Sequence, residues 1–459
     1  MSISFRMLLA VLFLPAMALA QPPDTVWTRT FDIAGSEDDA IEVAADAHGN
    51  VYLFGQTIDT SFYNRFVIIK YDASGTAVLT RYTPSEFVSD QDGGIAIDRD
   101  GSVVVAYASN GNYLVAKYAP DLDTLWTRRF KPGESDYPYD VACDRSGNII
   151  VTGRSRDSLG DWDYLTIKYS SSGETLWTRR YDSGNSDWAR SIAIDTANGI
   201  VICGVGESNG YGYLKYDSLG SLLWGRPWPG DDVYGVAIEP DGGVLLAGTD
   251  STRHFRLMRS DPEGNMLWVA GIGVDDGCGT SVCPDDGGIL VTGFVNQDMC
   301  LARYDTLGSQ VWSLKRSDTL REGNSSLCLD SAGDIVVAVT SGWYSFEDYI
   351  TVIKYATASS VAGNQGIGAE PVPLLLERNP CRGSAKVRCR AVGSSPMELS
   401  VYSGDGRLVR TLARAGRSAP DRVWWDGRDE AGRLVPAGTY LLCWKTGIRQ
   451  GSTALVLLR

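Results

Sequence analysis

A repeat of roughly 44 to 52 residues runs from residue 24 to residue 356 and limits the possible folds more than any other feature. It is plainest where a tryptophan precedes Thr and Arg, at Trp27, Trp126 and Trp177. Weaker copies fall at Leu79, Trp224, Trp268 and Trp312. Repeats of this length are typical of β-propeller blades of four strands. The seven copies therefore predict seven blades.

Each copy contains four short apolar segments separated by turns. The first segment ends at an acidic residue that is followed three positions later by glycine, as at Asp46 and Asp144. An Asp side chain accepts hydrogen bonds from backbone N–H groups and the glycine tolerates a positive φ, which favours a compact hairpin. Nearly continuous apolar runs, such as residues 149–152, indicate strands that are covered on both faces, as in stacked blades.

The two ends of the repeat region complement each other. The region opens with a lone fourth strand around Trp27 and finishes with the first three strands of a unit, ending at Tyr355. Pairing the first strand with the last three closes a ring and removes its exposed edges. An open solenoid would explain the repeats but not these complementary pieces. We therefore predict an all-β fold with a seven-bladed β-propeller at residues 21–356, closed by an N-terminal strand.

The start of the chain has the pattern of a secretory signal peptide at residues 1–20, with Arg6 before an apolar stretch and a small-residue end at Ala20. No later segment has the roughly 20 apolar residues that span a bilayer as a helix. We expect a secreted or cell-surface protein, and a monomer. With 56 acidic against 42 basic residues, the net charge of -14 argues against nucleic acid as a partner.

The tail differs from the repeats in pattern and in charge. After a predicted linker at residues 357–372, residues 373–459 alternate strand-like segments with glycine turns, which favours a small Ig-like β-sandwich. From residue 371 onward, 15 Lys and Arg stand against 7 Asp and Glu, whereas the repeat region is strongly acidic. The two domains therefore carry opposite charge.

Both parts resemble known families. The segment from Lys168 to Trp177 resembles the bacterial propeller repeats of the SBBP and delta-60 type, and it is similar to the repeat of quinone-dependent dehydrogenases. These motifs specify blades rather than chemistry. The tail, from Asn379 to a final apolar strand, resembles the C-terminal sorting domain of type IX secretion cargo and the Ig-like domain of flagellar-hook capping proteins. The resemblance implies surface delivery and contact with secretion machinery. Cys381 departs from the pattern, and an accessory Ig-like module is the alternative.

One set of residues recurs with the repeat and suggests a site. An acidic residue lies eight positions before the first turn of every unit, namely Asp38, Asp90, Asp136, Asp187, Asp231, Asp276 and Glu322. If the first strands line a central channel, these carboxylates form a ring at one rim, a candidate metal site for calcium or a site for a basic ligand. Alternatively, each acid caps its own loop. Tyr137 and Trp188 follow two of the acids and either form an aromatic rim for glycans or peptides or pack between blades.

Catalytic motifs are sparse. Only two histidines are present, His48 and His254, and they fall in different repeats, which excludes a histidine triad or a histidine metal cluster. We therefore predict a non-enzymatic binding or structural module for a glycan, peptide or surface protein, without a cofactor unless calcium occupies the acidic ring. The alternative is a carboxylate-based glycan hydrolase or lyase. An acidic pair with unequal surroundings would favour the enzyme, and uniform blades would favour binding.

Overall fold

The computed structural model divides the chain into two compact units, Met1–Ser360 and Val361–Arg459. It describes residues 22–32, 38–58, 64–83, 93–131, 133, 135–158, 160–206, 212–316, 322–341, 348–357, 374–376, 381–382, 385–389, 397–403, 407–413, 422–446 and 449–458. The signal peptide expected at residues 1–20 lies outside these ranges, as does nearly all of the expected linker. Within the described ranges, no helix is long and apolar enough to cross a membrane.

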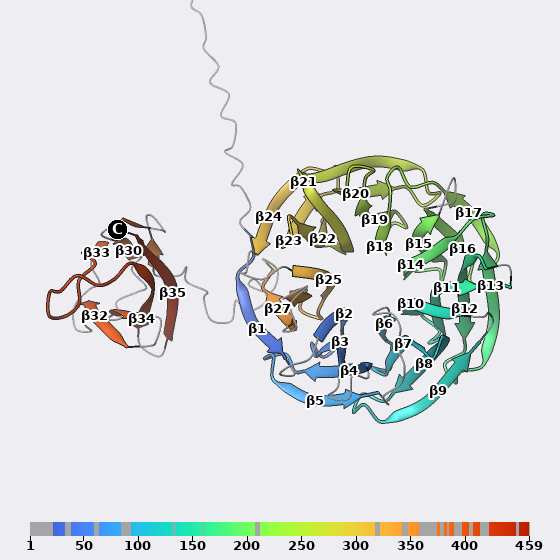
Figure 1. The fold of residues 1–459 in the computed structure, drawn as a ribbon, viewed down its shortest axis with the longest axis horizontal. Coiled ribbons are helices and arrows are strands. Elements are labelled where there is room, and N and C mark those ends of the chain that lie inside the picture. The colour runs from blue at the N-terminus through green and yellow to red at the C-terminus, as the bar shows by residue number, and fades with distance from the viewer. Residues whose placement is uncertain are drawn as a thin grey trace, which may run out of the picture. The chain divides into compact units, whose positions relative to one another are not determined.

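The first unit is a ring of antiparallel blades around a central channel (Figure 1), and the first strand of each blade is innermost. The first three blades comprise β2 (Asp38–Ala45), β3 (Val51–Ile58), β4 (Asn64–Tyr71) and β5 (Ala77–Tyr82); β6 (Gly93–Ile97), β7 (Val103–Ser109), β8 (Asn112–Tyr118) and β9 (Thr124–Phe130); and β10 (Asp136–Cys143), β11 (Ile149–Arg156), β12 (Trp162–Tyr169) and β13 (Thr175–Tyr181). The next two comprise β14 (Asp187–Ile194), β15 (Ile200–Gly206), β16 (Tyr213–Tyr216) and β17 (Leu222–Arg226); and β18 (Val233–Ile238), β19 (Val244–Thr249), β20 (His254–Ser260) and the first part of β21 (Met266–Asp285).

The remaining strands complete and close the ring. The second part of β21 forms blade six with β22 (Gly288–Val295), β23 (Asp298–Asp305) and β24 (Gln310–Arg316). Blade seven contains β25 (Glu322–Leu329), β26 (Ile335–Ser341), β27 (Tyr349–Tyr355) and β1 (Thr25–Phe31). Because β1 pairs antiparallel with β27, from Thr25 opposite Tyr355 to Phe31 opposite Ile350, the predicted closure and the all-β, seven-bladed fold are confirmed.

The hairpin turns between first and second strands form as the Asp and Gly pattern predicts. Asp144 Oδ1 accepts hydrogen bonds from the N–H groups of Ser146 and Asn148, and Gly147 has a φ of 77°. The turn acid also meets a lysine from the third strand, since Lys168 Nζ lies 2.8 Å from Asp144 Oδ2. The same pair recurs between Lys117 and Asp98, Lys215 and Asp195, and Lys354 and Asp330. An ion pair thus ties the third strand to the hairpin.

The recurring Trp and Arg of the outer strands join neighbouring blades. Trp126 Nε1 donates to Ser171 O at 3.1 Å, and Arg128 Nε donates to Gly173 O at 2.9 Å. Both acceptors lie in the turn between the third and fourth strands of the following blade. Gly173 has a φ of 84°, and a Cβ there would lie 3.0 Å from the Trp126 ring, so the turn requires glycine. The signature residues of the repeat therefore hold one blade to the next.

The second unit contains two sheets. One sheet has the order β28 (Leu374–Leu376), β30 (Ala385–Cys389) and β33 (Arg422–Trp425). The other has the order β29 (Cys381–Arg382), β35 (Arg449–Leu458), β34 (Gly438–Thr446), β31 (Met397–Ser403) and β32 (Leu408–Ala413). Trp425 of the first sheet is fully buried and its ring centroid lies 5.1 Å from that of Tyr440 in the second. The two sheets therefore pack against each other through these rings.

Candidate functional site: the mouth of the central channel

The channel is lined by the innermost strands of all seven blades and holds a cavity of about 230 Å³. In most of these strands a β-bulge interrupts the pairing midway, for instance between Pro138 and Asp140 of β10 and between Ala189 and Ser191 of β14. A bulge leaves one residue unpaired and turns its neighbours. The residues at and just after the bulges are those that line the cavity, including Tyr139 and Arg190.

Carboxylate and hydroxyl side chains beside the bulges bond to the next blade around the channel. Glu42 Oε2 accepts a hydrogen bond from Ile95 N at 2.7 Å, and Asp140 Oδ2 accepts one from Ile192 N at 2.8 Å. Burial raises the pKa of Asp140 to about 6. Burial, followed by the charge of Asp140, raises the pKa of Glu42 well above its ordinary value. These two acids in the channel are therefore acceptors for backbone N–H groups of the neighbouring blade.

The acids that the sequence placed at one rim lie at the starts of the innermost strands wherever they are described. Asp38, Asp136 and Asp187 open β2, β10 and β14 and are fully buried, whereas Asp231 is exposed just before β18. Asp90 lies outside the described residues.

The sixth repeat departs from this register. Its first hairpin is tighter, with Asp285 paired opposite Gly288, so that Gly277 occupies the position equivalent to Asp136. Asp276 lies one residue earlier. For Asp276 and Glu322 the structure describes the backbone alone.

Two of the rim acids bond to their own loops. Gly133 N donates to Asp136 Oδ2 at 3.2 Å, and Ser183 donates to Asp187 through its N–H at 2.8 Å and its hydroxyl at 3.0 Å. Burial raises the pKa of Asp136, while hydrogen bonds from Ser155 and Gly133 oppose the shift. This geometry is that of loop capping, the local alternative that the sequence left open.

Blades three to five place arginine and aromatic side chains together beside the channel. The Arg154 guanidinium lies 4.5 Å from the Trp162 ring centroid, 4.9 Å from that of Tyr137 and 5.6 Å from that of Trp188. Arg190 lies 4.8 Å from the Tyr139 ring and 5.7 Å from that of Tyr234. We call these seven residues, Arg154, Arg190, Tyr137, Tyr139, Trp162, Trp188 and Tyr234, the arginine–aromatic cluster.

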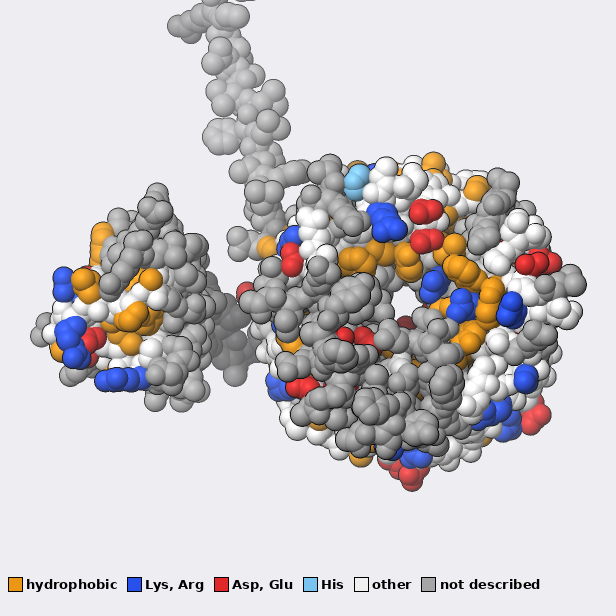
Figure 2. Space-filling model, in the orientation of Figure 1, with side chains coloured by type: hydrophobic (Ala, Val, Ile, Leu, Met, Phe, Trp, Pro, Cys, Tyr) orange, Lys and Arg blue, Asp and Glu red, His pale blue; other side chains and the backbone are white. Residues whose placement is uncertain are grey.

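The face drawn in Figure 2 shows Lys and Arg side chains and hydrophobic side chains beside the opening, on the side where Figure 1 places β10 and β14. The other blades have Ile41, Gly93, Thr280 and Ser325 at the equivalent positions of their innermost strands. The blades are therefore not uniform at the channel, and the cationic and aromatic groups lie on one side.

Sequence reasoning identified part of this cluster. Tyr137 and Trp188 were candidates for an aromatic rim, and the structure places both around Arg154. Arg154 and Trp162 come from second and third strands, and no repeated position draws attention to them. The available signal was Arg154, a cationic residue that comes soon after the apolar start of the second strand, Ile149–Arg156.

Fold and channel together define a seven-bladed β-propeller. No protein-family model matches the sequence. Over 107 residues the chain is 23% identical to an uncharacterized WD repeat-containing protein, L264, of Acanthamoeba polyphaga mimivirus. That match covers 20% of this chain and 8% of the viral protein, so the chain spans a small part of that relative's length.

Two solved structures are similar in fold. One is PorZ, a surface component of the type-IX secretion system of Porphyromonas gingivalis, with 13% identity, a TM-score of 0.48, and coverage of 92% of this chain and 59% of PorZ. The other is the β-propeller domain of Cps50 (Swd1) from Myceliophteria thermophila, with 11% identity, a TM-score of 0.48, and coverage of 72% and 99%. Because both scores are below 0.5, the description of the fold rests on the strand pairing of this chain, and no role is transferred.

Proposed function

We propose that this protein is an exported, surface-associated β-propeller that binds a partner at the mouth of its central channel. The observation that carries the proposal is the arginine–aromatic cluster. Aromatic faces around Arg154 and Arg190 hold both guanidinium groups in place, and a fixed guanidinium suits bidentate recognition of a carboxylate, sulfate or phosphate. In a chain with a net charge of -14, such a cationic mouth favours a ligand with an anionic group.

The ligand classes expected from the sequence were a glycan, a peptide and a surface protein. An anionic group can belong to any of them, so the proposal fixes the chemistry of the contact rather than the polymer. Half-buried Tyr137, Trp162 and Trp188 add apolar surface beside the charge. Stacking on such rings suits the flat apolar faces of sugars and of aromatic side chains.

Binding of the full chain to arrays of acidic and neutral glycans and peptides tests this proposal. Arg154→Gln and Arg190→Gln should each weaken binding of acidic ligands at least tenfold. The matched control is Arg128→Gln, because Arg128 lies 5.4 Å from the Trp126 ring in an outer strand, away from the channel. Equal binding of acidic and neutral ligands, or equal losses in all three variants, would refute the proposal.

The second unit is proposed to be the sorting or attachment domain. Its support is the resemblance to type IX sorting domains, together with its packing as a separate unit of two sheets. Removal of residues 371–459 should leave a folded propeller and abolish delivery to the surface of the native host. Surface labelling and fractionation measure this, and a truncated chain that still reaches the surface would contradict the sorting role.

One observation favours the enzymatic alternative, a carboxylate-based glycan hydrolase or lyase. Glu42 and Asp140 line the channel with raised pKa values, and a carboxyl group with a raised pKa can act as a general acid. Both are also acceptors for backbone N–H groups, which gives each a structural role. Glycan cleavage that is lost in both Glu42→Gln and Asp140→Asn, with binding kept, would establish the enzyme; no cleavage of any bound glycan by the intact chain would exclude it.

A further inference from the structure

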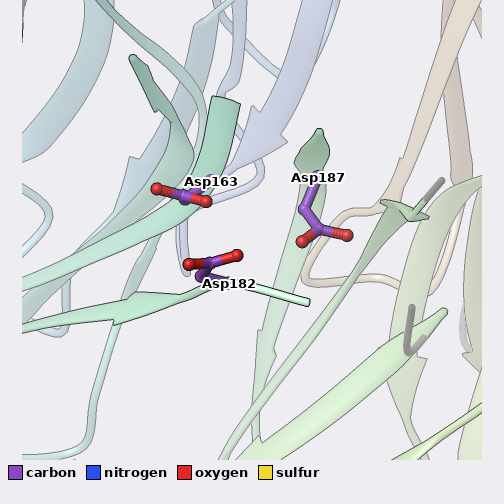
Figure 3. Close-up of side chains that lie close together, drawn as sticks. All are labelled: Asp163, Asp182 and Asp187. Atoms are coloured by element: carbon purple, nitrogen blue, oxygen red, sulfur yellow. The ribbon is translucent and has the colours of Figure 1, made fainter. Parts of the chain in front are cut away.

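Three carboxylates lie close together where blades three and four meet. Asp163 is the second residue of β12, Asp182 follows β13, and Asp187 opens β14. One oxygen from each lies within 4.8 Å of those of the other two. Figure 3 shows the three carboxylates around one space, approached from three different strands or strand ends. They belong neither to the channel lining nor to the arginine–aromatic cluster.

The three carboxylates have different neighbours. Arg180 forms an ion pair with Asp163 Oδ2. Asp187 is fully buried and is held by Ser183, while exposed Asp182 accepts a hydrogen bond from Gly184 N at 2.6 Å. The ion pair with Arg180 therefore balances the charge of Asp163, and hydrogen bonds hold the other two acids.

Asp163 provides a second, independent indication of a ligand. Its side chain is 3% exposed, and its Oδ1 is a buried oxygen without a hydrogen-bond partner in the described part of the chain. A buried carboxylate oxygen without a partner is costly, because water is lost and nothing replaces it. Burial raises the pKa of Asp163, with Asp182 and Asp157 adding to the shift and Arg180 opposing it.

We propose that Asp163, Asp182 and Asp187 bind one divalent cation of the calcium class. Ca²⁺ takes oxygen ligands at about 2.3–2.6 Å in flexible geometry, so carboxylate oxygens up to roughly 5 Å apart can share one ion. The ion would supply the missing partner of Asp163 Oδ1. Exposed Asp182 gives the ion access from solvent.

The cation also has a structural consequence. Asp163 follows Trp162 in β12, and Asp187 precedes Trp188 in β14. A shared ion therefore links the two strand starts that carry tryptophans of the arginine–aromatic cluster. The inference stands apart from the proposed ligand, because cation binding is measured with no ligand present, and either can fail without the other.

Terbium luminescence excited through tryptophan tests the site on the full chain, since Tb³⁺ replaces Ca²⁺ and Trp162 and Trp188 adjoin two of the acids. We expect sensitised emission that Ca²⁺ displaces, and a melting temperature that Ca²⁺ raises and chelation lowers. Asp182→Asn should weaken Ca²⁺ binding at least tenfold and remove most of the Ca²⁺-dependent rise in melting temperature. Because Asp182 is exposed, this variant should fold as the parent does.

The matched control is Asp121→Asn. Exposed Asp121 accepts a hydrogen bond from the N–H two residues ahead, as Asp182 does, but belongs to no group of three acids among the described residues. It should bind Tb³⁺ and Ca²⁺ as the parent does. Absence of sensitised emission in the parent, or the same Ca²⁺ affinity in the parent and in Asp182→Asn, would overturn the inference.

Discussion

Replacement of Lys168 by Met should destabilise the propeller strongly, because Lys168 belongs to a buried ion pair. The side chains of Lys168 and Asp144 are 4% and 1% exposed, and their charged atoms are 2.8 Å apart. Lys168 also donates to Ser218 O of the next blade at 3.1 Å. Removing one partner of a buried pair costs about 3–5 kcal/mol, since the other charge is left uncompensated. Lys168→Met should therefore lose about that much free energy of unfolding, measured by urea denaturation at pH 7.

An exposed pair of the same kind provides the control. Lys315 and Asp298 are 3.0 Å apart with side chains 45% and 21% exposed, so Lys315→Met should lose less than about 1 kcal/mol. Hydrogen bonds and Lys168 lower the pKa of Asp144 against the opposing effect of burial, which is the largest single influence. Without Lys168, protonation of Asp144 removes the uncompensated charge, so the deficit of Lys168→Met should shrink as pH falls from 7 to 4. Similar losses in both variants, or a deficit independent of pH, would refute this reasoning.

Three further predictions concern closure, the channel and the turns. Deletion of residues 21–34 removes the partner of β27 and should abolish cooperative unfolding or solubility; a deleted chain that melts like the parent would exclude closure as a source of stability. Burial raises the pKa of Asp140 to about 6, so between about pH 4 and pH 6 the folded chain retains a proton that the unfolded chain releases. The free energy of unfolding should therefore fall as pH rises from about 4 to 6. Asp140→Asn should flatten that slope in a pH series of denaturation curves. Gly220→Ala should lower the free energy of unfolding by more than the about 1–2 kcal/mol that a positive φ alone costs, because the new Cβ would also lie 3.0 Å from the Trp177 ring. Gly287→Ala has open space around its Cβ and should lose only the part due to the positive φ. Equal losses in thermal melts would contradict the contact with Trp177.

The ring could be predicted from the sequence because its evidence is repeated and its ends are complementary. The role of the repeated Trp and Arg could not, since the acceptor of Trp126 is Ser171, 45 residues away in another blade. Self-comparison shows which residues recur but not which copy each one contacts. The joining of blades through Trp126 and Arg128 is visible only in the assembled ring.

The channel was harder to predict than the blades for a local reason. Alternation along a strand assigns side chains to faces only while the period of two holds, and bulges beside Tyr139 and Arg190 interrupt it. In the sixth repeat, the hairpin at Asp285 is tighter than in the other repeats. Counting eight residues back from the turn therefore gives Asp276, whereas the structurally equivalent residue is Gly277. The acid cluster of the cation proposal draws on three different elements, and only Asp187 belongs to a repeated position.

The closure of blade seven makes the location of the chain ends arbitrary with respect to the ring. Ala356 N donates to Asp24 O at 2.9 Å, so the polypeptide enters and leaves the propeller at one point. A short peptide across that point would make the ring a continuous circle, and new termini could then be opened in the turn of any other blade. Circular permutation of this kind would carry the attached second unit to a different position around the ring while every blade retained both of its neighbours.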